Sequence, residues 1–250
     1  MPKTASQAIP LAQARQLARP EYRSLIIGCG RRAARVSAAL RQRLGPSISN
    51  IQILNPVTSN AKRMQMWDWL LIPEHDGVRG ANVIHFHGAL VKPISAAPRA
   101  QTHLVILLGA PSKNLPWQVA DLDTWLAQAR RQDKPVIICP SRRTTDAVLA
   151  HLQQQADNNW EIIAATDSTA YRQALVQAAE FWVSGDSINM LAEACTSQQA
   201  IKILGRDKAN GKLVRYFSEL DRLGRTTSKQ ALPEVKRVAQ QLIRRGALLL

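Results

Sequence analysis

The sequence predicts an α/β protein in which parallel sheets are covered by helices on both faces. Short apolar runs rich in Val, Ile and Leu alternate with longer amphipathic segments along most of the 250 residues. Turn-forming residues separate these runs, and no segment repeats with a fixed period. Strands that alternate with crossover helices assemble into parallel sheets. A chain of this length can bury the cores of one or two such domains.

The first third of the chain supplies the elements of one sheet. The run Ser-Leu-Ile-Ile-Gly at residues 24–28 predicts a short buried strand, and the apolar spacing of residues 33–44 predicts a helix after it. Further strands are expected at residues 51–54, 69–72 and 82–86, where short apolar runs lie between clusters of turn-forming residues.

A linker and a second, more regular set of elements follow. Two prolines and several small residues at positions 92–98 indicate the linker. We therefore expect an N-terminal domain over residues 1–95, a second domain over residues 100–230 and a C-terminal helix over residues 231–250. In the second domain the sequence predicts strands at residues 103–109, 135–140, 160–165, 181–184 and 200–204, and helices at residues 118–131, 145–155, 171–179, 188–195 and 211–223.

The charge of the chain indicates an anionic partner. There are 33 Lys and Arg against 18 Asp and Glu, a formal net charge of +15. Nucleic acid, an anionic membrane surface and phosphorylated substrates all fit such an excess. Aromatic residues make up 5% of the chain, and no basic run is interleaved with Phe or Tyr, which disfavours a stacking platform for single-stranded nucleic acid. We therefore expect a phosphorylated ligand and a peripheral contact with an anionic membrane.

The cysteines and the hydropathy pattern indicate the cellular compartment in which the protein is expected. Cys29, Cys139 and Cys195 are odd in number and lack CxxC spacing, which predicts a reducing compartment and no structural zinc. No apolar run approaches the ~18–20 residues of a membrane span. The residues after Met1 lack the apolar core that is typical of a signal peptide, so we expect none. The sequence thus predicts a cytoplasmic protein that can associate with the inner face of the membrane.

The most informative stretch is the junction at residues 182–195. An apolar run ending in Ser-Gly-Asp-Ser predicts a buried strand that stops at a turn, and the spacing of the following apolar residues predicts a helix docked on the sheet. Asp186 or Ser187 occupies the N-cap position, so free N–H groups and the positive end of the helix dipole can receive a phosphate. Glu193, about one and two-thirds turns further along the helix, could accept hydrogen bonds from ribose hydroxyls.

Two other predicted strands, ending at residues 109 and 140, run into turns that combine small residues with cations. Small residues let backbone N–H groups approach a phosphate, and Lys or Arg neutralises its charge. Ligands of parallel α/β sheets bind at the carboxyl ends of the strands. The residues expected to bind a nucleotide are Gly109, Ser112, Lys113, Ser141, Arg142, Arg143, Asp186, Ser187, Met190 and Glu193.

Several motifs, in order along residues 24–245, resemble the mitochondrial-fission ELM family, a plant and bacterial group. The resemblance implies a fold like that of the GT-B glycosyltransferases, with two Rossmann-like domains and the nucleotide sugar held mainly by the C-terminal one. It also places Gly28, Gly30, Arg31 and Arg32 among the site residues. The motifs are residues 28–32, 73–77, 82–83, 88–90, 109–113, 141–144 and 186–194, with Trp117 and the Lys212, Arg215, Tyr216 and Phe217 set that leads into residues 220–224.

Two departures from the family pattern affect these expectations. Family members usually begin with a further strand and helix that carry a Gly-rich, Gln-containing motif, whereas polar and Ala-rich residues 1–23 precede the first clear strand here. We therefore expect an N-terminally shortened member whose first domain, the acceptor side, is short by one βα unit. Residues 198–200 are Gln-Gln-Ala where the family tends to have Gly-Lys-Pro, a change that we interpret as structural.

Candidate catalytic residues follow the apolar run at residues 69–73. His75 or Asp76 could act as the general base that an inverting glycosyltransferase needs to deprotonate an acceptor hydroxyl. The alternative is a turn in which Asp76 bonds its own backbone before Gly77. His85 and His87 share a strand face at a spacing that can bind metal, but a third ligand is not evident, and sheet packing or solvent exposure explains them as well.

Together these observations predict a GT-B-type glycosyltransferase. It would transfer a sugar from a nucleoside-diphosphate sugar to a membrane-associated or envelope acceptor, with no metal and no cofactor beyond the donor. The main alternative is a non-catalytic ELM-type interaction or scaffold protein that retains the fold. A nucleic-acid-binding protein is a third class, which rests on charge alone.

Overall fold

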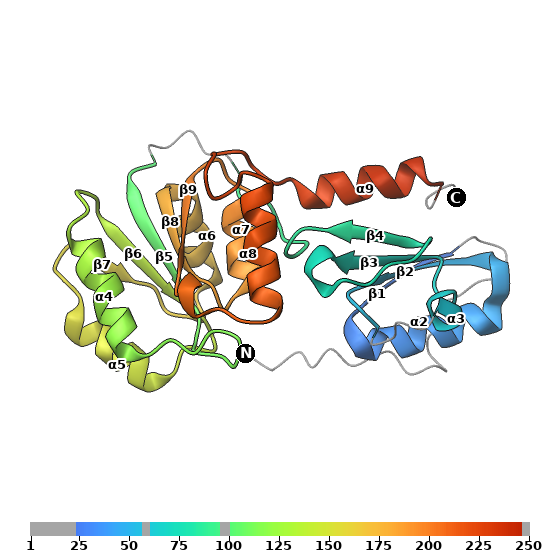
Figure 1. The fold of residues 1–250 in the computed structure, drawn as a ribbon, viewed down its shortest axis with the longest axis horizontal. Helices are drawn as coiled ribbons and strands as arrows, with labels where there is room; N and C mark the ends of the chain where they lie inside the picture. Colours follow the sequence, from blue (N-terminus) through green and yellow to red (C-terminus); the bar gives the residue numbers. More distant parts are fainter. Residues whose placement is uncertain (1–23, 57–60, 96–100, 247–250) are drawn as a thin grey trace. The chain divides into compact units, whose positions relative to one another are not determined.

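The computed structural model describes residues 24–56, 61–95 and 101–246. The chain divides into two compact units, which are residues 1–86 with 235–250 (unit 1) and residues 87–234 (unit 2). Each unit contains a parallel sheet with helices packed against it (Figure 1). The predicted fold class is therefore confirmed. The expected loss of one βα unit concerns residues 1–23, which lie outside the described residues, and it stays a prediction.

Unit 1 is built on a four-stranded sheet in the order β1-β2-β3-β4, with all neighbours parallel. The sequence prediction missed the short helix α3, which is a single turn without an amphipathic pattern of its own. The strands are β1 (Ser24–Cys29), β2 (Ile48–Ile53), β3 (Trp69–Pro73) and β4 (Val83–Phe86), and the helices are α2 (Gly30–Leu44), α3 (Ala61–Met64) and α9 (Glu234–Arg244), with 3-10 turns η1 (Gly45–Ser47) and η2 (Glu74–Asp76).

The two faces of this sheet are covered differently. Ala34 and Ala38 of α2 pack in one cluster with Met64, Trp67 and Leu70, so α2 and α3 share a face of the sheet (Figure 1). Small alanines allow this close approach of helix and strand. On the opposite face, the guanidinium of Arg245, just after α9, lies 5.6 Å from the ring centroid of Trp69.

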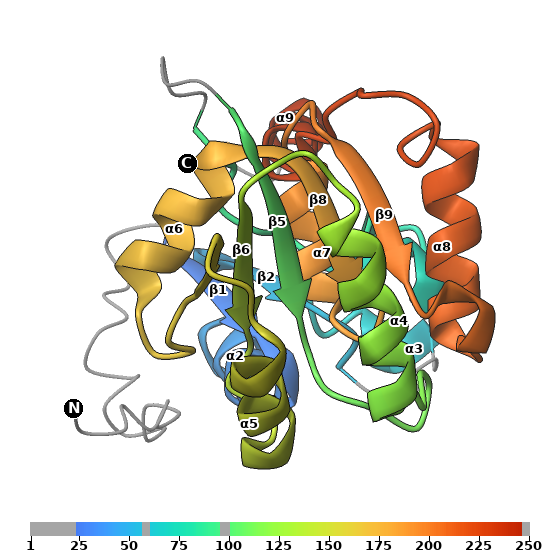
Figure 2. The same ribbon diagram turned by 90° about the vertical axis from the view of Figure 1, so that its left-hand side faces the viewer.

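Unit 2 contains a five-stranded parallel sheet in the order β7-β6-β5-β8-β9. Figures 1 and 2 show α4 and α5 on one face of this sheet and α7 on the other. The strands are β5 (His103–Leu108), β6 (Val136–Pro140), β7 (Trp160–Ile162), β8 (Ala178–Ser184) and β9 (Ala200–Leu204), and the helices are α4 (Val119–Arg130), α5 (Asp146–Gln155), α6 (Ser168–Gln177), α7 (Ile188–Cys195) and α8 (Lys212–Arg222), with the 3-10 turn η3 (Arg206–Lys208).

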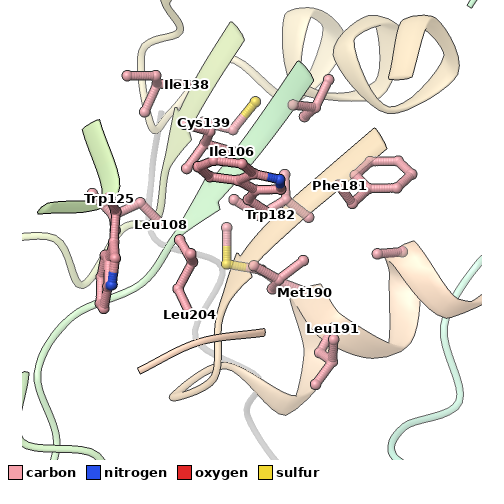
Figure 3. Close-up of a cluster of buried hydrophobic side chains, with 14 of the residues drawn as sticks. Ile106, Leu108, Trp125, Ile138, Cys139, Phe181, Trp182, Met190, Leu191 and Leu204 are labelled. Carbon is pink, nitrogen blue, oxygen red and sulfur yellow. The ribbon is translucent and has the colours of Figure 1, made fainter. Parts of the chain in front are cut away.

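One continuous core holds unit 2 together. Strands β5, β6 and β8 are almost wholly buried, and Figure 3 shows side chains of these strands meeting those of α4, α7 and β9. Trp117, just before α4, and Trp125 of α4 lie in this core with ring centroids 5.5 Å apart. The rigid central strands fix the positions of the turns that follow them.

The division between the units falls at Phe86 and Glu234, not at the proline-containing linker around residue 95. The backbone N–H of His87 donates to the carboxylate of Glu234 at 2.6 Å, and the His87 ring bonds Glu219 of α8. These contacts fasten both points at which the chain leaves unit 2. The C-terminal helix α9 then belongs with unit 1.

Within the described residues, each helix is too short or too polar to cross a lipid bilayer.

Candidate functional site

The carboxyl ends of β5 and β8 mark the point in the unit 2 sheet where the chain reverses its direction of progress. From β5 the chain proceeds through β6 to β7, and it then returns to β8 on the other side of β5. Loops after neighbouring strands diverge at such a switch point and leave a crevice for a ligand. The turns that begin at Gly109 and Gly185 lie here. The sequence predicted that each of them follows a strand.

The helix α7 begins directly at this edge. Ser187 is its N-cap, and the Ser187 hydroxyl accepts a hydrogen bond from the N–H of Met190. The geometry of an α-helix leaves the N–H groups of Ile188 and Asn189 without acceptors inside the helix. The turn therefore presents backbone donors and the positive end of a helix dipole, the two features that bind a phosphate group.

Asp186 ties the strand-end turns together. Its side chain is fully buried, and its Oδ2 accepts hydrogen bonds from the Ala110 N–H and the Arg143 guanidinium, each at 3.0 Å. A Cβ at Gly109 would lie 2.1 Å from the same oxygen, so this close approach requires glycine. In the structure Asp186 and Arg143 form an ion pair across two turns. Their assignment to the ligand stays a prediction.

The Asp186 carboxylate also has an oxygen without a partner. Oδ1 is buried and makes no hydrogen bond among the described residues. A buried unpaired oxygen costs free energy, on the order of 1–3 kcal/mol.

The turn after β6 is held by a residue that the sequence analysis did not select. The Thr144 hydroxyl lies 2.8 Å from the Gly109 carbonyl oxygen and 3.0 Å from the Ser141 N–H. The Ser141 hydroxyl accepts the Arg143 N–H within the same turn. Arg142 is exposed, and its guanidinium forms no ion pair with the residues that the structure describes, so it is available to an anion.

The turn after β5 folds back on itself. The Ser112 hydroxyl accepts the N–H of Leu115, and these two residues form an isolated antiparallel bridge. Lys113 is exposed, and its carbonyl oxygen accepts a hydrogen bond from Asn210. The Ser112 hydroxyl thus accepts a hydrogen bond within the turn and can still donate one to a ligand, and the Lys113 side chain is exposed.

Glu193 lies one and a half turns into α7 and contacts the neighbouring helix α6. Its Oε2 accepts the Tyr171 hydroxyl at 2.5 Å, and its Oε1 lies 3.2 Å from the Arg172 guanidinium. Burial, and then the charge of Glu193, raise the pKa of Tyr171, so the phenol remains a donor. A carboxylate offers about four lone-pair directions, so these contacts leave acceptor capacity for ribose hydroxyls.

The candidate base residues belong to unit 1 and occupy the 3-10 turn η2 after β3. His75 is 4% exposed, and its Nε2 lies 3.8 Å from Asp76 Oδ1. The Asp76 side chain is 27% exposed. The preceding Glu74 pairs with Arg79 at 2.5 Å. Asp76 is therefore the more accessible of the two candidates.

The glycine turn after β1 carries the other predicted site residues of unit 1. A Cβ at Gly28 would lie 2.6 Å from Oε1 of the buried Gln52, and Gly30 has a φ of +75°. Both positions thus have a steric reason to be glycine. Arg31 and Arg32 begin α2 and are exposed, with no acidic residue in the first turn of the helix.

His85 and His87 have separate partners. The His85 ring lies 2.7 Å from the Val78 carbonyl oxygen, whereas the His87 ring contacts Glu219. No group of three or more His, Cys, Asp or Glu side chains in the described part of the chain is arranged to hold a metal ion. Glu219 carried no sequence signal, because a single acidic residue in an amphipathic helix is usually exposed.

Comparison with known proteins shows a family model that matches nearly the whole chain. The model of the family described as mitochondrial fission ELM1 matches residues 2–245. The match begins well before residue 24, where the sequence resemblance started. No curated protein matches the chain.

Several solved structures match this chain at 9–12% sequence identity. MurG from Acinetobacter baumannii is 12% identical over 84% of this chain, with a TM-score of 0.45. MnaA from S. aureus, solved with UDP, is 10% identical over 90% of this chain and 72% of its own, with a TM-score of 0.48. TarM is 9% identical over 76% of this chain, with a TM-score of 0.47. The chain spans 61% of the MurG chain and 43% of the TarM chain.

Proposed function

The chain belongs to the mitochondrial fission ELM1 family, and we propose that it is a glycosyltransferase that uses a nucleoside-diphosphate sugar. The observation that carries this proposal is the start of α7 at the sheet's switch point, where Ser187 caps the helix beside the Gly109 turn. In this proposal unit 2 binds the donor, and the sugar passes to a membrane-associated or envelope acceptor.

The diphosphate would be bound without a metal ion. The free N–H groups at the start of α7 would meet its oxygens, and the helix dipole would favour its charge. Lys113 and Arg142 are exposed cations on the two neighbouring turns. They would offset the charge that develops on the diphosphate as it leaves, which is the electrostatic contribution expected to dominate catalysis.

Glu193 and Asp76 would take the other two roles. Glu193 would accept hydrogen bonds from the ribose while Tyr171 and Arg172 hold its carboxylate in place. Deprotonation of the acceptor hydroxyl needs a general base. Of the two candidates from the sequence, the partly exposed Asp76 is favoured over the buried His75. Transfer then breaks the sugar–phosphate bond, forms the new glycosidic bond and releases the nucleoside diphosphate.

One observation favours the alternative of a non-catalytic scaffold. Asp186, Arg143 and Glu193 all have partners within unit 2, so they have structural roles that need no ligand. A scaffold that retained the family fold would keep these contacts for stability. Nucleotide binding separates the two functions.

Calorimetric titration of the full chain with UDP, GDP and uridine tests the proposal. Glu193→Ala should weaken both nucleoside and nucleotide binding about ten- to a hundredfold, since a hydrogen bond to a charged group contributes roughly 1.5–3 kcal/mol. Ser187→Ala should weaken only phosphate-containing ligands. Glu161→Ala, at an exposed carboxylate on β7, is the matched control. No binding of any nucleoside diphosphate at millimolar concentration would favour the scaffold.

A further inference from the structure

The positive charge of the chain is concentrated in unit 1. Its described residues contain 12 Lys and Arg against 3 Asp and Glu, a net charge of +9. The described residues of unit 2 contain 16 and 14, a net charge of +2. Unit 2 is the larger of the two, so the excess is not a general property of the surface. A specific part of unit 1 must account for it.

The largest share lies on the outer side of α2 and α3, the helices on one face of the unit 1 sheet (Figure 1). Helix α9 and the adjoining Arg245 carry four of the twelve cations. No Asp or Glu occurs between residues 22 and 67, which include both helices. Helix α2 buries Ala34, Ala38 and Leu40 and presents its polar side to solvent. We define the α2–α3 face by the six exposed cations Arg31, Arg32, Arg35, Arg43, Lys62 and Arg63.

The position of these cations is unfavourable for the helix itself. Arg31, Arg32 and Arg35 lie in the first two turns of α2, where the helix dipole is positive and where acidic residues are normally preferred. Arg35 follows Arg32 by three residues and Arg31 by four, so its charge lies beside theirs on one side of the helix and the like charges repel one another. The stability of the helix therefore does not explain these arginines, whereas binding to an anionic partner outside the protein explains them.

We propose that the α2–α3 face docks on an anionic membrane. Basic side chains near a surface of anionic lipids are each attracted by it, and a row of them along a helix lying on the surface acts together. Met66, 37% exposed, follows the cations of α3 and supplies an apolar side chain that can enter the headgroup layer. The face is about 22 Å long, from the 1.5 Å rise of the 15-residue helix α2.

The exposed apolar residues favour lipid over nucleic acid as the partner. The large apolar side chains exposed in the described part of unit 1 are Ile27, Leu54, Met66, Val235 and Ile243, and none is aromatic. Nucleic-acid platforms for single strands stack bases on aromatic rings. The docking also goes beyond the transferase proposal, because it needs neither a nucleotide nor an active site.

Vesicle co-sedimentation of the full chain without nucleotide tests this assignment. The probes are vesicles of phosphatidylcholine alone and with about one-third phosphatidylserine, at 0.1 M and 1 M salt. The triple variant R31E/R32E/R35E should bind the anionic vesicles at least ~100-fold more weakly, from about a fivefold loss for each cation. These substitutions place carboxylates at the positive end of α2 and so favour the helix, which protects against loss of folding.

The matched control is K92E/R131E/R222E, which changes the net charge by the same amount at exposed positions of unit 2. It should retain vesicle binding to within about threefold, because the Debye length is only about 10 Å at 0.1 M salt. Nucleotide titration of a second variant, R35E/R43E/R63E, distinguishes the two proposals. It reverses three exposed cations of the α2–α3 face that are not among the expected site residues, so unit 2 should still bind UDP while vesicle binding is lost.

Three results would overturn the proposal. Equal losses in R31E/R32E/R35E and its matched control would show that overall charge, not this face, governs binding. Binding that persists in 1 M salt or on phosphatidylcholine alone would show apolar insertion elsewhere. Strong, steeply salt-dependent binding to duplex DNA with no vesicle binding would make nucleic acid the partner of this face.

Discussion

Units 1 and 2 carry similar numbers of cations but very different numbers of carboxylates. In unit 2, ion pairs such as Arg143–Asp186, Arg172–Glu193 and Arg206–Asp221 connect turns and helices. In unit 1, the ion pairs Arg41–Asp68 and Arg79–Glu74 involve two of the three acidic residues that the structure describes there. Unit 2 therefore uses much of its charge to fix its own strand ends, whereas the charge of unit 1 is directed outward.

The three thiols offer the largest contrast between the units. Cys29 in unit 1 is exposed, and Cys139 and Cys195 in unit 2 are buried. Burial raises the pKa of each unit 2 thiol to about 12. At pH 8 their reactive thiolate fraction is then about one part in ten thousand.

A thiol-specific chromogenic reagent at pH 8 should therefore modify one cysteine quickly and the other two at least ~1000-fold more slowly, until the protein is unfolded. Cys29→Ser should abolish the fast phase. Two fast thiols in the native protein would contradict the packing described for unit 2.

The second contrast is between a buried and an exposed arginine. Arg225 is 1% exposed and donates to the carbonyl oxygens of Ser197 and Gln199, beyond the end of α7. Arg225→Ala leaves buried acceptors and a cavity, so the free energy of unfolding should fall by roughly 3–5 kcal/mol. Arg35→Ala, on the exposed side of α2, should change it by less than about 0.5 kcal/mol. Urea unfolding of both variants measures the difference, and similar values would refute it.

The third prediction concerns the close approach of two strand-end turns in unit 2. Gly109→Ala would place a Cβ against the Asp186 carboxylate, and we expect a loss of about 1–3 kcal/mol in the free energy of unfolding. In an Asp186→Ala background the same substitution should cost less, because the clashing oxygen is gone. A double-mutant cycle by urea unfolding measures this coupling, and additive losses would show that the two residues act independently.

The smallest expected effect is the pH dependence of an exposed pair in unit 2. Hydrogen bonds from Arg206 lower the pKa of Asp221. A lowered pKa contributes stability above the unfolded-state value near 3.9, and that stability is lost as the pH falls through the folded-state pKa. Because both side chains are about 40% exposed, the contribution should be under about 1 kcal/mol.

This contribution is tested by measuring the free energy of unfolding of the wild type and of Asp221→Asn at pH 7 and at pH 2.5. The wild type should lose slightly more stability on acidification than the variant. A smaller loss in the wild type would show that the pair does not stabilise the folded state.

Sequence reasoning predicted the elements well and their tertiary contacts poorly. The alternation of apolar runs located all nine strands of the described residues to within a few residues, and Ser187 was one of two N-cap choices. The bond from Asp186 to Ala110 joins residues 76 positions apart, and no local pattern encodes it. Similarly, the prolines near residue 95 suggested a boundary that His87 and Glu234 place elsewhere, because long-range hydrogen bonds decide where a unit ends.

Hydrogen–deuterium exchange of the full chain, measured with UDP and separately with anionic vesicles, tests the division of roles between the units most directly. We predict that UDP slows exchange in unit 2 at the turns after β5 and β6 and at the start of α7, while vesicles slow it in α2 and α3. Protection of the β1–α2 turn by UDP, or of the α7 turn by vesicles, would contradict the assignment of the nucleotide to unit 2 and of the membrane to unit 1.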